Sequence, residues 1–319
     1  MKIATSAIAS ARVVPELLSP AGSIDAVRAA VANGANAVYL GASQFNARDE
    51  GAQLSLDELE QACAIAHAGG ARIYLTFNVL IKTSEMPGAL LYLGECIDRG
   101  IDAAIVQDIG AVRLIREVYP QLEIHGSTQM TVHDGSGAKV MQRLGVERVV
   151  LARENTIDDI HSIRDAVPEL GLETFVHGAL CISYSGQCLM SGMISERSAN
   201  RGSCAQSCRK DYSLNDVATG ATLDEGFLIS AKDLAAHDHL AELAEAGVGT
   251  LKVEGRKKDA QSGQEVSEER LITEYQEIDG KKVAKKVEIL RDGKPYMELE
   301  VLEVNSLEKV DDNEFAKPK

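Results

Sequence analysis

The segment ELLSPAGSIDAVRAAVANGANAVYLGA, residues 16–42, decides the fold that the sequence predicts. It begins with a short apolar run, continues into an Ala- and Val-rich stretch with helical spacing, and returns to a second apolar run at AVYLGA. Ser23 has the side chain of a helix N-cap, and Gly34 suits the left-handed position that ends a helix. This order predicts a strand, a helix and a second strand, which is one unit of a parallel sheet.

The same order repeats through residues 15–258. Because each apolar run is followed by a helical stretch, we predict an α/β protein with a TIM-like (β/α)8 barrel. A doubly wound open sheet is the alternative, but no G-x-G-x-x-G loop follows the first run. The eight runs are residues 16–19, 37–42, 72–78, 103–108, 123–128, 148–154, 173–178 and 250–255.

Composition limits the classes of function. The chain has 319 residues, 45% of them hydrophobic, with 4% aromatic residues and no Trp. Its net charge of −15 argues against general binding to a phosphate backbone. No apolar run reaches the roughly 18 residues of a membrane helix, and the N-terminal residues lack the apolar region of a signal peptide. We therefore expect a cytoplasmic protein that does not bind a membrane.

Polar residues follow most of the predicted strands. Active sites of such barrels lie at the carboxyl ends of the strands, so this recurrence predicts a polar pocket at one face. Candidate substrate-binding residues are Asn78, Gln107, His125, Gln129, Arg153, Glu154 and Arg256, beside further polar strand-end residues at Ser19, Asp108 and Ser127. The candidate catalytic residues are His177, Lys252 and Glu254.

Lys252, Glu254 and Arg256 alternate, which puts them on one face of the last strand and its extension. Lys252 and Glu254 suit either a structural salt bridge or a site for an anionic substrate, with Arg256 as a bidentate clamp. His177 precedes Cys181 by four residues, which leaves a thiol nucleophile as a further alternative.

Residues 179–226 break the repeat and contain four of the six cysteines. A loop this long in a compact domain is usually functional. The four cysteines are separated by six, fifteen and three residues, and only the last pair has the spacing of a zinc knuckle. Spacing alone leaves an iron–sulfur cluster, zinc and free or redox-active thiols open. The cysteines are Cys181, Cys188, Cys204 and Cys208.

Two further segments have local predictions. YSLNDVATGATL, residues 212–223, predicts a hairpin within the Cys-rich insertion. Residues 259–280 are polar and predict at most a loose helix, and the alternating residues around 291–294 predict a hairpin. We therefore expect a barrel domain over 14–258 and, over 259–319, a divergent C-terminal helix, a small β-rich appendage and a charged tail.

At its cysteines the chain resembles peptidase family U32, the collagenase-like peptidase family. The resemblance covers about residues 14–258 and extends to NRGSCAQSCRKDYSL (200–214), SAKDL (230–234) and LKVEGRKK (251–258). After residue 258 the chain departs from the family pattern. The family motif corresponds here to Glu173, Phe175, Gly178-Ala179, Cys181, Gly186-Gln187-Cys188 and Ser191.

The resemblance implies an iron–sulfur protein acting in hydroxylation of RNA, either a tRNA wobble uridine or a ribosomal RNA cytidine. It implies a 4Fe–4S cluster on Cys181, Cys188, Cys204 and Cys208, with zinc as the alternative metal. The implied partners are RNA, a small anionic metabolite such as prephenate, and a possible protein partner. The alternative functions are a collagenase-like peptidase and a non-catalytic iron–sulfur subunit.

Overall fold

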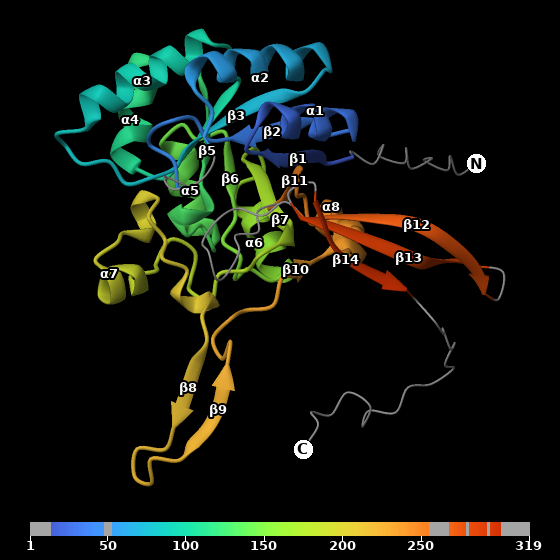
Figure 1. Ribbon diagram of the computed structural model, residues 1–319. Helices are drawn as coiled ribbons and strands as arrows, with labels where there is room; N and C mark the ends of the chain where they lie inside the picture. Colours follow the sequence, from blue (N-terminus) through green and yellow to red (C-terminus); the bar gives the residue numbers. More distant parts are fainter. Residues whose placement is uncertain (1–13, 48–52, 255–267, 279–280, 292–293, 301–319) are drawn as a thin grey trace, which may run out of the picture. The chain divides into compact units, whose positions relative to one another are not determined.

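The structure is a computed structural model that describes residues 14–47, 53–254, 268–278, 281–291 and 294–300 (Figure 1). The chain divides into two compact units, Met1–Arg256 and Lys257–Lys319. Each unit is described by itself below.

The first unit is a closed parallel barrel, as the sequence predicts. Its strands follow the order β1-β2-β3-β4-β5-β6-β7-β11, and β11 pairs with β1 to complete the ring. Leu18 of β1 lies opposite Lys252 of β11, so the first and last strands meet although more than 230 residues separate them. The eight strands are β1 (Glu16–Ala21), β2 (Ala37–Leu40), β3 (Arg72–Phe77), β4 (Ala103–Val106), β5 (Glu123–Gly126), β6 (Arg148–Val150), β7 (Gly171–Gly178) and β11 (Thr250–Val253).

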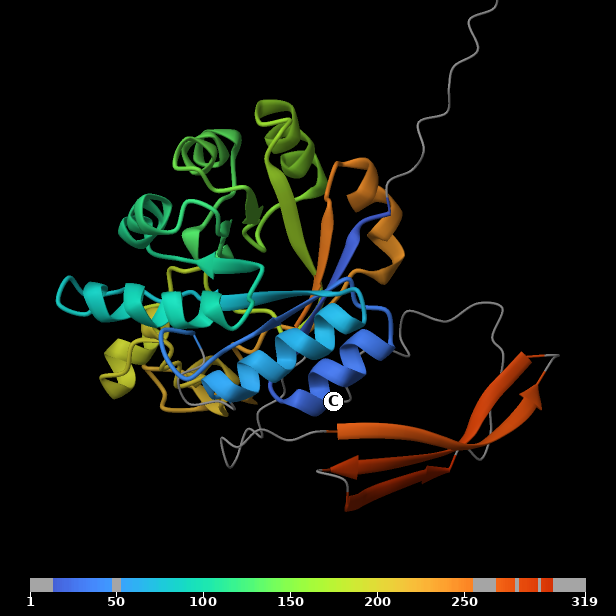
Figure 2. The same ribbon diagram turned by 90° about the horizontal axis from the view of Figure 1, so that it is seen from above.

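Helices surround the strands (Figure 2). The Ser23 hydroxyl accepts a hydrogen bond from the Ala26 amide and caps the first helix, as predicted, and Thr156 caps α6 with a capping box. Such caps satisfy amides that have no partner inside the helix. The helices are α1 (Ile24–Ala32), α2 (Leu56–Ala68), α3 (Met86–Asp98), α4 (Ile109–Val118), α5 (Gly135–Arg143), α6 (Ile157–Ala166) and α8 (Leu240–Glu245), with short η1 (Thr128–Met130) and η4 (His237–His239). Over the described residues, no helix has the length and apolar character needed to cross a bilayer.

Two apolar clusters hold the barrel together. The larger lies between the strands and the helices and includes Leu59, Ile73 and Ile115. The smaller fills part of the barrel interior and is built around Leu18 and Tyr74. Side chains alternate across a strand, so these two sets are the two faces of the same sheet.

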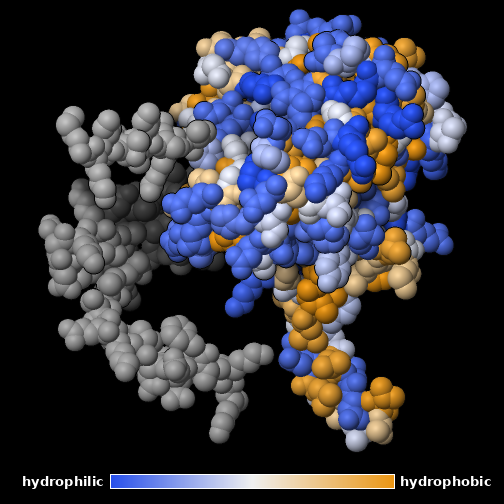
Figure 3. All heavy atoms as spheres, turned by 180° about the vertical axis from the view of Figure 1, so that it is seen from behind, coloured by the Kyte–Doolittle hydropathy of each residue, from blue (hydrophilic) through white to orange (hydrophobic). Residues whose placement is uncertain are grey.

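The Cys-rich insertion follows β7. It contains α7 (Met190–Ser195), η2 (Ala199–Arg201), η3 (Ser207–Arg209) and a hairpin of β8 (Tyr212–Asn215) with β9 (Thr222–Gly226), and β10 (Leu234–Ala235) then pairs antiparallel to β7. This hairpin lies where the sequence predicts one. In the space-filling view from behind, apolar side chains are visible along this projecting hairpin (Figure 3), whose exposed residues include Leu214, Val217 and Leu223.

The second unit is a three-stranded antiparallel sheet. Its strands are β12 (Glu268–Ile278), β13 (Lys281–Arg291) and β14 (Lys294–Glu300). The structure therefore differs from the helical prediction over residues 268–278. Ile272, Thr273 and Tyr275 are residue types that favour strands, and pairing along 281–291 provides hydrogen bonds that a polar isolated helix lacks. Residues 259–267 and the predicted tail after residue 300 lie outside the described residues.

Candidate functional site at the carboxyl ends of the barrel strands

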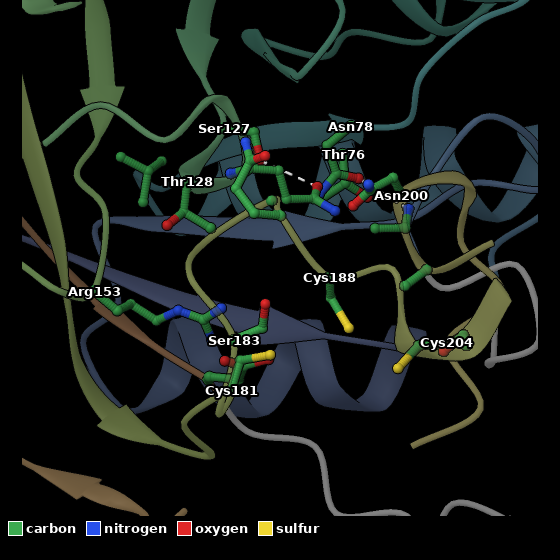
Figure 4. Close-up of a pocket in the computed structure, with 18 of the residues that line it drawn as sticks. Thr76, Asn78, Ser127, Thr128, Arg153, Cys181, Ser183, Cys188, Asn200 and Cys204 are labelled. Carbon is green, nitrogen blue, oxygen red and sulfur yellow. Dashed lines mark hydrogen bonds between the residues drawn. The ribbon is translucent and has the colours of Figure 1, made fainter. Parts of the chain in front are cut away.

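A cavity of about 780 Å³ opens at the carboxyl ends of the barrel strands (Figure 4). Its walls combine residues at the strand ends, such as Asn78 after β3 and Arg153 after β6, with residues of the Cys-rich insertion. The cavity lies at the end of the barrel where the sequence predicts a pocket. Its volume falls within the roughly 300–1,000 Å³ of small-molecule sites.

All four clustered cysteines line this one cavity. In Figure 4 the thiols of Cys181, Cys188 and Cys204 surround a common space. Burial, and then the neighbouring Cys181 and Cys204 thiols, raise the pKa of Cys208 above its ordinary value. The insertion therefore brings together thiols that are up to 27 positions apart in the chain.

Four thiols in one cavity could hold either of two kinds of metal site. Among the described residues, no three His, Cys, Asp or Glu side chains are grouped closely enough to hold a single metal ion. A zinc site needs all its sulfurs about 2.3 Å from one ion, whereas a cubane cluster binds each thiolate to a different iron. The backbone N–H of Gln206 also donates to the Cys204 sulfur over 3.4 Å. Four thiolates are a donor set that an iron–sulfur cluster uses, with one thiolate on each iron, and that structural zinc sites use as well.

Two glycines let the insertion approach the barrel closely. Gly186 has φ +72°, and a Cβ there would lie 2.0 Å from the carbonyl oxygen of Gln129. Gly178 has φ +119°, and its Cβ would lie 2.1 Å from the carbonyl oxygen of Glu254. Only glycine tolerates both the backbone angle and this contact. Gly186 therefore brings the insertion close to η1, and Gly178 brings the end of β7, where the insertion starts, close to the residue that follows β11.

Ser185 anchors the same part of the insertion. It is fully buried, its amide donates to Glu154 Oε1 over 2.5 Å, and its hydroxyl accepts from the Arg153 amide over 3.2 Å. Thr131 Oγ1 donates to the Ser185 carbonyl over 2.6 Å. Glu154, which the sequence predicts to bind substrate, thus holds the loop between Cys181 and Cys188 instead.

Two arginines hold the second half of the insertion. Arg201 donates to both carboxylate oxygens of Glu85, over 2.8 and 3.0 Å, and to the Leu80 carbonyl over 2.6 Å. Arg209, next to Cys208, donates to the Leu180 carbonyl over 2.7 Å, next to Cys181. A guanidinium with several fixed acceptors is well suited to hold irregular backbone. These hydrogen bonds hold the backbone next to Cys181 and Cys208.

Lys252 forms part of the cavity floor and is 4% exposed. Its ammonium lies 2.8 Å from Glu173 Oε1 and 4.4 Å from the centre of the Tyr39 ring. Burial alone would raise the pKa of Glu173, but Lys252 and the other neighbouring cations hold it below its ordinary value. Lys252 thus pairs with Glu173, whereas the sequence predicts Glu254 as its partner.

A second charged layer lies below this floor. Arg148 lies 2.6 Å from Glu16 Oε1, and His125 Nε2 lies 2.7 Å from Glu123 Oε1. The hydrogen bond with His125 is the main reason that the pKa of Glu123 falls to about 2. Burial lowers the pKa of His125, which is fully enclosed in the barrel. His125, a predicted substrate contact, is therefore part of the barrel interior.

The cavity contains five of the predicted site residues besides the cysteines. The side-chain oxygen Oδ1 of Asn78 accepts a hydrogen bond from the Ala47 amide over 3.0 Å, and the Arg153 guanidinium lies 5.9 Å from the centre of the Phe175 ring. The five residues are Asn78, Gln129, Arg153, Lys252 and Glu254.

The other predicted residues are elsewhere. Gln107 is buried at the end of β4 and does not line the cavity. The His177 side chain is exposed outside the cavity, because the register between β7 and β11 shifts at Lys252 and Val253. Arg256 lies outside the described residues.

Sequence reasoning did not identify the interior partners Glu16 and Arg148. Both are the first residue of an apolar run, and a charged residue at the start of a strand is usually expected to face solvent. Their period-two relation to Leu18 and Val150 is the signal that places them on the inner face.

The chain is similar to a known protein family and to several named proteins. Residues 22–288 match the profile of peptidase family U32. The chain is 36% identical over 250 residues to tRNA hydroxylation protein P1 of Bacillus subtilis, covering 76% of this chain and 59% of that protein. It is 40% identical over 244 residues to the 23S rRNA 5-hydroxycytidine C2501 synthase of Escherichia coli, covering 76% of this chain and 37% of that protein. A collagenase of Porphyromonas gingivalis is 31% identical over 254 residues, covering 76% of this chain and 61% of that protein.

These matches leave part of each relative uncovered, since the chain spans 59% or less of the two hydroxylation proteins. A solved U32 peptidase structure is similar with a TM-score of 0.53 and 13% identity, covering 80% of this chain and 99% of that one. That likeness supports the barrel fold. The chain belongs to peptidase family U32.

Proposed function

We propose that this chain is an iron–sulfur protein that acts in the hydroxylation of tRNA or ribosomal RNA. One observation carries the proposal: all four cysteines of the insertion line one cavity at the end of the barrel where such folds place their chemistry. The names of the hydroxylation proteins to which the chain is similar support the choice of RNA.

Cys181, Cys188, Cys204 and Cys208 would hold a 4Fe–4S cluster. When bound, such a cluster supplies one-electron redox chemistry, and hydrogen bonds to its sulfur ligands tune its potential. The Gln206 amide makes one such bond to the Cys204 sulfur. The hydrogen bonds of Ser185, between Cys181 and Cys188, and of Arg209, next to Cys208, support the proposal, because a site binds its cofactor better when the backbone around its ligands is fixed.

A small anionic metabolite, such as prephenate, would bind beside the cysteines. Lys252 and Arg153 give the cavity two cationic side chains, and Thr76 and Ser127 add hydroxyls. Glu173 keeps the Lys252 ammonium in place over 2.8 Å. A planar guanidinium binds carboxylates in a bidentate manner, which gives Arg153 the chemistry to orient such an anion.

The peptidase alternative has less support from the site. Within the described residues, the cavity lining contains no His and no Asp to activate a nucleophile. The side chain of His177, which precedes Cys181, is exposed outside the cavity. The similarity to a collagenase keeps peptide hydrolysis as the alternative outcome of the test.

The test is expression of the chain in a bacterial host that lacks its own RNA-hydroxylation proteins. We expect a hydroxylated uridine or cytidine in mass spectra of the digested tRNA or rRNA. Cys188→Ser should abolish this product, and the matched control Cys63→Ala should retain it, because Cys63 is buried between helices away from the cavity.

Two results would contradict the proposal. One is RNA without a hydroxylated nucleoside although the protein is folded and loaded with iron, which would leave the non-catalytic subunit. The other is a peptidase activity that purified wild-type protein has and the Cys188→Ser variant lacks.

A further inference from the structure

The mouth of the cavity is apolar and exposed. Five large side chains of the insertion line the cavity, yet each is more than half exposed, between 54% and 85%. They lie within thirteen residues of sequence, around Cys188. We call this group the apolar lip, and its members are Ile182, Tyr184, Leu189, Met193 and Ile194.

Such a cluster is unusual on a protein surface. Single exposed apolar residues are common, but a contiguous group beside a cavity marks a binding surface. Tyr184 is the aromatic member and is 70% exposed, although the loop that carries it is anchored through the fully buried Ser185. The ring is therefore presented to solvent on a fixed backbone.

The charge of the chain restricts what the lip binds. RNA binding that depends on phosphate contacts requires many cations, and this chain has a net charge of −15. Recognition of RNA by such a protein must depend more on contacts with bases. Proteins that act on a base in RNA expose it to the site and stack it on an aromatic side chain.

The interior of the cavity suits the edge of a base. Asn78 and Asn200 place side-chain amides in its wall, and Ser127 adds a hydroxyl (Figure 4). Gln129 also lines the cavity. Amides and hydroxyls are the groups that read the edges of unpaired bases. A flat protein surface would cover the lip but would leave these interior groups unused.

We propose that the apolar lip is a nucleobase platform, on which Tyr184 stacks an unpaired pyrimidine of the RNA as it enters the cavity. This inference rests on the proposed function and specifies how that site takes its substrate. Leu189 and Met193 provide the apolar contacts around the base.

The absence of Trp from the chain makes the platform measurable. Tyr184→Trp introduces the sole Trp, and we expect a short oligouridine or oligocytidine RNA to quench its fluorescence. Stacking on an aromatic ring is lost in Tyr184→Ala, which should weaken binding of the same RNA roughly 5- to 150-fold. Tyr184→Phe keeps the ring and should stay within about twofold of wild type.

Phe227→Ala is the matched control, because Phe227 is 55% exposed but does not line the cavity. It should bind RNA as wild type does. Met193→Ala, at 85% exposure, tests the lip at a second position and should weaken binding as well. All variants are measured as anaerobically purified protein with iron and sulfide equal to wild type. Binding should depend only weakly on salt.

The platform is refuted if Tyr184→Ala and Met193→Ala bind the RNA as tightly as wild type. It is also refuted if the indole fluorescence of the Tyr184→Trp variant responds to a bound protein and not to RNA. In either case hydroxylation of RNA in the host can persist, and the proposed function then stands without the platform. If wild type neither binds nor modifies RNA, the proposed function itself fails.

Discussion

Glu173 offers the sharpest test of the barrel interior. Its carboxylate is fully buried and faces two cations, with Lys252 Nζ at 2.8 Å and Arg148 Nη1 at 3.5 Å. Glu173→Gln keeps the shape of the side chain and removes the charge. Lys252 would then be a nearly buried ammonium without a carboxylate at contact distance.

Removing one member of a buried ion pair costs about 3–5 kcal/mol. The lower end applies here, because Arg148 keeps its pair with Glu16 at 2.6 Å and Lys252 keeps the Tyr39 ring. We therefore expect the free energy of unfolding to fall by about 3 kcal/mol and Tm to fall by roughly 6–12 °C. Urea and thermal unfolding followed by circular dichroism measure both quantities.

The matched control is an exposed ion pair in the same barrel. Glu60 is 67% exposed and lies 3.3 Å from Arg99, so Glu60→Gln should cost less than about 1 kcal/mol. If Glu173→Gln costs no more than Glu60→Gln, the Glu173 charge does not stabilise the interior, and the account of how Lys252 is held is wrong.

Two further predictions concern acid stability and the seating of the insertion. The pKa of Glu123 lies at about 2, below its ordinary 4.5. Its contribution to the free energy of unfolding is therefore complete above pH 4.5 and is lost as the pH falls from 4.5 towards 2. In cluster-free protein the free energy of unfolding should therefore decrease between pH 4.5 and pH 2, and this decrease should be smaller in Glu123→Gln. An equal decrease in the variant would contradict the lowered pKa of Glu123. Gly186→Ala should lower iron bound per chain severalfold, because the new Cβ would meet the Gln129 carbonyl at 2.0 Å, whereas Gly220→Ala, with a similar φ of +69° and open space, should bind iron as wild type does. Equal iron in both variants would show that the close approach of Gly186 is not needed.

The barrel was predictable because its local signals agree. The segment around Ser23 and Gly34 contains a cap, a helix and two strands in the order found, and the same order recurs at the other strands. The last strand, Thr250–Val253, pairs with the first as the eight-run pattern requires. Local residue chemistry was sufficient at these positions, because a parallel sheet covered by helices imposes the same pattern on every unit.

Partners in the site were less predictable, because they depend on register and on loop geometry. Period-two alternation puts Lys252 and Glu254 on one face, but the carboxylate that reaches Lys252 is Glu173 of the neighbouring strand. A register shift leaves His177 exposed, and the role of Glu154 follows from a single hydrogen bond to Ser185. Sequence spacing contains none of these distances.

Residues 268–278 show the same limit in the second unit. The polar residues 259–280 predict at most a loose helix, whereas pairing with residues 281–291 makes residues 268–278 a strand. The strand that pairs with residues 268–278 decides their conformation, and the local sequence pattern does not identify that partner strand.

Iron and sulfide analysis of anaerobically purified protein tests the central claim most directly. We predict about four iron and four sulfide ions per chain with the visible absorption of a 4Fe–4S cluster. Single alanine variants of Cys181, Cys188, Cys204 and Cys208 should lose this cluster, and Cys63→Ala should keep it. Protein that is folded and colourless, without iron or sulfide or with one zinc ion in their place, would contradict the account.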